Sequence, residues 1–112
     1  MVDPKAGEDA SGAVDFGFLE GFAAGDRTVI SEVLELFVAQ AQRLAPSLDA
    51  AAAGWRDAAH TLKGSARGIG AQALGEACAR AEAEGEGGLP AVRTALAAAV
   101  ADIAAYRART EG

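Results

Sequence analysis

The chain has 112 residues, a length that suits one domain with a single hydrophobic core. Its 16 acidic and 10 basic residues give a net charge of −6, which argues against a general binder of nucleic acid or of anionic membranes. The single cysteine, Cys78, cannot form an internal disulfide, so we expect a reducing, cytoplasmic compartment. The sequence shows no secretory signal and no long uncharged apolar run, and no membrane span is expected.

The composition predicts an all-α fold, because alanine, the strongest helix former, supplies 30 of the 112 residues. The first predicted helix is short, about 15–24, with Asp15 as its N-cap. A long second helix is predicted over about 26–53, because apolar residues recur at spacings of three and four. Pro46 interrupts this helix, and we expect a kink there because the apolar face continues past the proline.

Three further helices complete the predicted fold. The third begins near Trp55 and ends at Gly68 and Gly70, and its core stripe is Trp55, Ala59, Leu62, Ala66 and Ile69. The fourth covers about 71–84, and a glycine-rich connection leads to a last helix with Pro90 in its first turn. Short connections favour antiparallel neighbours. The predicted architecture is an antiparallel four-helix bundle with a short additional N-terminal helix.

The domain boundaries follow from this pattern. Residues 1–12 are polar and contain glycine and proline, so we expect a flexible N-terminal tail. The helical bundle is expected over 13–108, and residues 109–112 are expected to form a flexible C-terminus.

His60 is the only histidine of the chain, and it lies on the third predicted helix away from the apolar stripe. Residues three or four positions away share its face, and these are Arg56, Asp57, Lys63 and Gly64. Arg67 follows two turns along in the same row. Three cations on one face of an acidic protein would attract and hold an anionic group attached to the imidazole.

Gly64 lies in the interior of this predicted helix, where glycine costs about 1 kcal/mol relative to alanine. In a chain so rich in alanine, we infer that its missing side chain lets another surface approach the imidazole. A neutral imidazole offers one nitrogen lone pair for attack, while an acceptor can hold the protonated nitrogen and fix the tautomer. The pattern predicts a bare, positively charged patch around one nucleophilic nitrogen.

Other interpretations of His60 have less support. A lone helical histidine is more often a solvated surface residue than a nucleophile. One histidine with one cysteine eighteen residues later is not a metal-ligand set, and no HxxxH or CxxC spacing is present. A hydrolase is disfavoured because there is no nucleophile elbow.

The segment Ala59-His60-Thr61-Leu62-Lys63-Gly64-Ser65-Ala66, followed by Ile69-Gly70 and Leu74, resembles the signature of histidine-containing phosphotransfer (HPt) domains. The long predicted helix before this segment, with a proline in its second half, also resembles the corresponding helix of that family. The resemblance covers about residues 15–106. It implies a helical bundle whose histidine accepts a phosphoryl group from an aspartate of one receiver domain and passes it to another.

The resemblance also implies roles for individual residues. His60 would be phosphorylated through its outward ring nitrogen, Lys63 would steady the phosphoryl oxygens, and Gly64 would admit the receiver's active site. Family members often hold the second ring nitrogen with a Gln or Glu 22 residues after the histidine, which here is Glu82. A phosphate contact of Arg67 is suggested by spacing alone.

We therefore expect a phosphocarrier without its own ATP site, since no P-loop or kinase glycine motif is present. No cofactor is expected on this chain, and Mg²⁺ is expected on the partner. The expected partners are receiver domains of a hybrid histidine kinase and of a response regulator, with a monomeric carrier. The docking surface is expected on the exposed side of the third helix and the start of the second, near Thr61, Ser65 and Gly68.

The sequence leaves two alternatives to a free-standing carrier. One is a non-phosphorylated helical interaction module that binds a receiver or kinase domain. The Lys63-Gly64 pair argues against it, because such a module needs no exposed glycine. The other is the phosphorylated domain of a chemotaxis-type histidine kinase, which differs in its attached domains.

Overall fold

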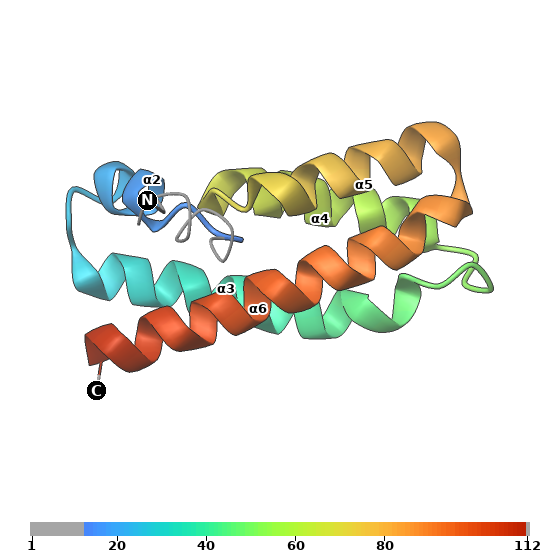
Figure 1. The fold of residues 1–112 in the computed structure, drawn as a ribbon. Coiled ribbons are helices and arrows are strands. Elements are labelled where there is room, and N and C mark those ends of the chain that lie inside the picture. Colours follow the sequence, from blue (N-terminus) through green and yellow to red (C-terminus); the bar gives the residue numbers. More distant parts are fainter. Residues whose placement is uncertain (1–12, 112) are drawn as a thin grey trace, which may run out of the picture.

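The computed structural model describes residues 13–111, which contain helices and their connections and no strand. The elements are α2 (Phe16–Phe22), α3 (Arg27–Leu44), the 3₁₀ turn η1 (Ala45–Ser47), α4 (Trp55–Ile69), α5 (Gln72–Glu84), the 3₁₀ turn η2 (Glu86–Gly88) and α6 (Leu89–Glu111). Helices α3 to α6 each run antiparallel to the next, and α2 lies at one end of the bundle (Figure 1). The predicted all-α bundle with a short additional N-terminal helix is confirmed.

The chain ends bear on the expected domain boundaries. The expected tail over residues 1–12 lies outside the described residues. At the other end, α6 continues to Glu111, so residues 109–111 of the expected flexible C-terminus are helical.

The core is formed by the inward faces of all four long helices. Helix α4 contributes the predicted stripe, with Ala59, Leu62, Ala66 and Ile69 buried and Trp55 partly buried. The larger fully buried side chains from other parts of the chain are Leu19, Leu34, Leu48, Leu74, Leu89, Val92 and Ile103. No buried polar or charged residue occurs among the described residues, so burial of apolar area is the main stabilising contribution to the bundle.

The prediction of one kinked helix through Pro46 is wrong. Helix α3 ends at Leu44, Pro46 lies in η1, and an irregular segment follows up to Trp55. Proline cannot donate the backbone hydrogen bond that a continuing helix needs, and its ring opposes the preceding turn. The apolar pattern continued because Leu48 is buried from this irregular segment, where its carbonyl accepts a hydrogen bond from Arg93 Nη1 at 2.6 Å.

Capping residues fix the junctions near the His60 helix. The carboxylate of Asp26 accepts from the backbone N–H groups of Thr28 and Val29, which caps α3. Gly70 ends α4 in the left-handed region at φ 83°. The carbonyl of Gly70 accepts from the backbone N–H of Asp15 at 2.9 Å, which attaches the N-terminal segment to the α4–α5 turn.

By length and composition alone, one helix among the described residues, Glu86–Thr110, is apolar enough to cross a membrane. Its apolar residues include Leu89, Val92 and Ile103, which are buried in the bundle core. Core helices meet the same criterion, so this feature is weak evidence for a membrane span.

Candidate functional site

The core stripe of α4 determines where His60 points. Since Ala59 and Leu62 face the interior, His60 projects from the opposite side of the helix, and its side chain is 69% exposed. The imidazole is therefore accessible from solvent while its helix is held firmly by packing. This confirms the predicted orientation of His60 away from the core.

Glu82 of α5 holds one nitrogen of the imidazole. Its Oε2 lies 2.9 Å from Nδ1 of His60. The antiparallel pairing of α4 and α5 produces this contact between residues 22 apart in sequence. The contact that the resemblance implied is thus present in the structure.

Lys63 holds the other oxygen of the same carboxylate, with Nζ 2.7 Å from Oε1 of Glu82. Both side chains are largely shielded, at 21% and 22% exposed. The hydrogen bond from Lys63, with a smaller contribution from His60, holds the pKa of Glu82 below its usual value of 4.5. Glu82 is therefore a carboxylate near neutral pH and can only accept hydrogen bonds. It follows that Nδ1 of His60 carries the proton, and that Nε2 of the neutral ring bears the free lone pair.

Arg56 reinforces the position of Glu82. Its Nη1 donates to the backbone carbonyl of Glu82, and its guanidinium lies over the ring of Trp55, 4.6 Å from the ring centroid. Two of the three cations predicted on the His60 face, Arg56 and Lys63, thus contact Glu82.

Nothing in the described part of the chain requires glycine at position 64. A Cβ built on Gly64 would meet nothing within 4 Å, and its helical backbone has no positive φ. The same open space surrounds Gly68. At these two positions the helix surface near His60 has no side chain and is open, as the close-approach interpretation requires.

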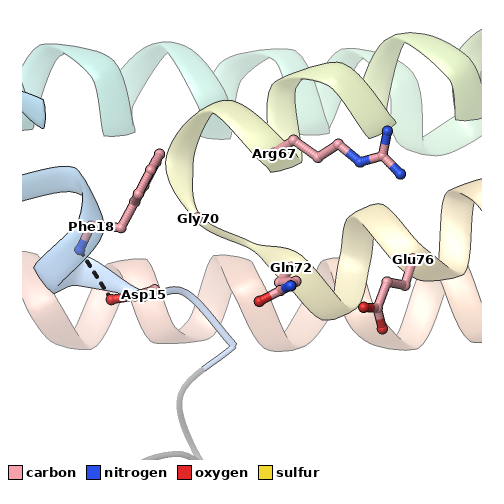
Figure 2. A pocket seen from close by; sticks show the side chains of 6 residues that line it. All are labelled: Asp15, Phe18, Arg67, Gly70, Gln72 and Glu76. Atoms are coloured by element: carbon pink, nitrogen blue, oxygen red, sulfur yellow. Dashed lines mark hydrogen bonds between the residues drawn. The ribbon is translucent and has the colours of Figure 1, made fainter.

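Arg67 lies further along α4, on one wall of a hollow of about 390 Å³. The hollow is lined by Asp15, Phe18, Arg67, Gly70, Gln72 and Glu76 (Figure 2). The Arg67 side chain runs along α4 away from Gly70, toward the half of the helix that carries His60. Its stem crosses α5 at Gly75, where a Cβ would be 3.2 Å from Cγ of Arg67.

The structure thus brings His60, Lys63 and Glu82 into direct contact, with Gly64 open beside them and Arg67 further along the same helix. Sequence reasoning missed the bond from Arg56 to the Glu82 carbonyl, because its acceptor is a backbone atom on another helix. It also missed Gly75. Gly75 is an unexplained glycine inside an alanine-rich helix, which is the same signal that identified Gly64.

Within residues 13–111 no group of three or more His, Cys, Asp or Glu side chains could hold a metal ion. Cys78 lies beneath the site but is fully buried. Burial, and next the charge of Glu82, raise the pKa of its thiol to about 11, so the reactive thiolate is scarce near neutral pH.

Comparisons with known proteins agree with this site. The family model of the Hpt domain matches residues 32–108, and the chain belongs to that family. A solved structure, histidine phosphotransferase ShpA from Caulobacter crescentus, is 58% identical in sequence, with a TM-score of 0.84. The match covers 89% of this chain and 95% of the ShpA chain. No curated protein matches the sequence.

The family and this structural match support a phosphorelay role in two-component signalling, as a phosphocarrier rather than a kinase. Membership also implies interaction with receiver domains.

Proposed function

We propose that the protein is a phosphorelay intermediate that carries a phosphoryl group on Nε2 of His60. The donor is an aspartyl phosphate on the receiver domain of a hybrid histidine kinase, and the acceptor is an aspartate of a response regulator. The observation that carries this proposal is the 2.9 Å contact of Nδ1 with the Glu82 carboxylate, which leaves Nε2 unprotonated on an exposed ring.

The transfer step needs no external base, because no proton has to be removed from His60. The Nε2 lone pair attacks phosphorus, the N–P bond forms, and the bond from phosphorus to the aspartate oxygen breaks, which releases the aspartate as a carboxylate. The proton on Nδ1 stays in place, so the phosphorylated ring becomes cationic. The charge of Glu82 stabilises that cation as it forms. Donation to the second receiver reverses these steps.

In this proposal Lys63 acts first through Glu82. In the unphosphorylated chain its ammonium group bonds to Oε1, so it fixes the carboxylate that orients the ring. Once the phosphoryl group is on His60, its oxygens compete for the same ammonium group, because Lys63 is one helical turn away. Lys63 thereby steadies the phosphoryl group, as the resemblance implied.

The receiver docks over α4 at Gly64 and along the neighbouring groove between α3 and α4. This groove has a volume of about 440 Å³, and residues lining it include Leu36, Ser65 and Gly68. Leu36 is 70% exposed, and contact with an apolar receiver surface would bury it. The proposed surface therefore adds an apolar contact further along α4 from the reactive nitrogen.

We further propose that Mg²⁺ and the acidic cluster that binds it belong to the receiver, so that this chain binds no cofactor and has no ATP site. The chain supplies the nucleophile, the carboxylate that orients it and the open helix face, and the receiver supplies the remaining charge stabilisation. The carrier acts in the cytoplasm as a monomer.

The test is transfer from receiver domains labelled with radioactive phosphate. Labelled receiver should phosphorylate the protein, and the labelled protein should pass the phosphate to a second, unlabelled receiver. The label should be acid-labile and base-stable. His60→Gln should abolish labelling and leave the helical circular dichroism signal unchanged. Labelling of this variant equal to the parent would overturn the proposal. If receivers bind the parent protein but never label it, the chain is a non-phosphorylated interaction module instead.

A further inference from the structure

Arg67 differs from the other two cations on the His60 face. Arg56 donates to the Glu82 carbonyl and Lys63 pairs with the Glu82 carboxylate. The Arg67 side chain makes no hydrogen bond or ion pair with the part of the chain that the structure describes, and the residue is exposed. Its charge is thus available to an anion from outside the chain.

The facing helix, α5, has a glycine and not an acidic residue opposite Arg67. In the antiparallel pair of α4 and α5, Gly75 lies opposite Arg67, two turns from the point where Glu82 lies opposite His60. A carboxylate at position 75 would neutralise Arg67 as Glu82 engages His60. Position 75 is instead a buried glycine in a helix interior, a disfavoured choice there. Its missing side chain lets the stem of Arg67 lie across α5.

The nearest acidic side chains leave Arg67 unpaired as well. Both Asp15 and Glu76 line the same hollow. The Asp15 carboxylate accepts from the backbone N–H of Phe18 at 3.0 Å and so caps α2. Figure 2 shows the Glu76 carboxylate turned away from the Arg67 guanidinium. Within the described residues neither of these carboxylates pairs with Arg67, so its charge can serve an anion on a partner.

We propose that Arg67 is a specificity-determining residue that forms an ion pair with a carboxylate on the docked receiver domain, a proposal that rests on the phosphorelay function above. Arg67 and His60 are seven residues apart, which is about 10 Å along the helix axis. The contact with Gly75 fixes the base of the Arg67 side chain at that level of the bundle, and the side chain then runs toward the half of α4 that carries His60 (Figure 2). The pair therefore anchors the partner's acidic surface beside the reacting atoms.

The experiment compares three variants of the full chain in transfer from a phosphorylated receiver. Arg67→Ala should raise KM about tenfold and leave the maximal rate nearly unchanged, because an interface charge acts on association. It should also weaken the dependence of KM on salt. Arg80→Ala is the matched control. It also removes one positive charge, but from the exposed side of α5 that points away from Glu82, and it should leave KM unchanged. Gly75→Ala should raise KM in the same direction as Arg67→Ala, because the added Cβ displaces the Arg67 stem.

A second measurement distinguishes the two anions that Arg67 could contact, a carboxylate of the receiver and the phosphoryl group on His60. The half-life of phosphorylated His60 without any receiver should be the same in the parent and in Arg67→Ala. A shortened half-life with an unchanged KM would assign Arg67 to the phosphoryl group and overturn the proposal. Equal KM values for Arg67→Ala and the parent would also overturn it. Failure of the parent to accept phosphate at all would instead reject the proposed function.

Discussion

Replacing Gly64 with alanine should make the protein more stable and less active. The Cβ would enter open space, so no repacking cost offsets the helix preference for alanine. The expected gain is about 1 kcal/mol in the free energy of unfolding. For a domain of this size that corresponds to an increase in Tm of roughly 4–8 °C. Urea and thermal unfolding monitored by circular dichroism would measure it.

The same methyl group should slow phosphotransfer, because it projects from the helix face where the receiver approaches Nε2 of His60. A loss of about 1.4 kcal/mol in transition-state stabilisation, caused by a small displacement of the partner, gives a tenfold slower transfer. Rapid-quench transfer from a phosphorylated receiver would measure this rate at saturating and at limiting receiver.

Gly68→Ala is the matched control, since it lies on the same helix with equally open space around its Cβ position. It should give a similar gain in stability with a smaller loss of transfer rate, because it is about 12 Å from His60 along the helix axis. Equal slowing by both variants would show that the effect does not depend on distance from Nε2, and would contradict close approach at Gly64 as its cause. Transfer by Gly64→Ala at the parent rate would refute the close-approach reasoning.

Three further predictions concern the pH dependence of stability, thiol reactivity and the α4–α5 turn. Because Lys63 and His60 lower the pKa of Glu82, this carboxylate stabilises the fold above its unfolded pKa of about 4.5 and loses that effect as the pH falls through its folded pKa. The stability difference between the parent and Glu82→Gln, measured by urea unfolding, should therefore be largest near neutral pH and shrink on acidification; a difference that is constant from neutral pH to about pH 3 would contradict the pairing. The buried Cys78, with a pKa of about 11, should resist iodoacetamide at pH 8 in the folded protein and react in urea, as mass spectrometry would show, whereas rapid labelling of the folded chain would disprove its burial. Gly70→Ala should destabilise the bundle by about 1–3 kcal/mol in urea unfolding, because φ is 83° and the new Cβ would lie 2.9 Å from the carbonyl oxygen of Asp15; an unchanged unfolding midpoint would contradict the constraint at this turn.

Much of the fold could be predicted from periodicity and capping. The stripe of α4 from Ala59 to Ile69 correctly predicted which side faces the core, and from this followed the exposure of His60. The course of the chain after Pro46 could not be predicted from the same pattern. Leu48 keeps the apolar spacing while it is buried from an irregular segment, so periodicity alone does not distinguish a kink from a helix end.

The site was predictable to the extent that its residues share a helix or a family motif. The face carrying His60, Lys63, Gly64 and Arg67 follows from helical geometry. The contact with Glu82 follows from the register of α4 against α5, which helical geometry does not provide and which the family spacing supplied. The pairing of Lys63 with Glu82 in the unphosphorylated chain depends on that same register, so it emerged only from the structure.

The central claim is that Nε2 of His60 carries the phosphoryl group while Nδ1 keeps its proton and donates a hydrogen bond to the Glu82 carboxylate. NMR of protein labelled with ¹⁵N in histidine tests it directly, since the chain has a single histidine, so that every ring signal belongs to His60 and only Nδ1 and Nε2 have to be distinguished. After transfer from a phosphorylated receiver, we expect phosphorus coupled to Nε2 and a protonated Nδ1. Phosphorus on Nδ1, or a histidine spectrum unchanged by a receiver that has lost its phosphate to the protein, would contradict the account.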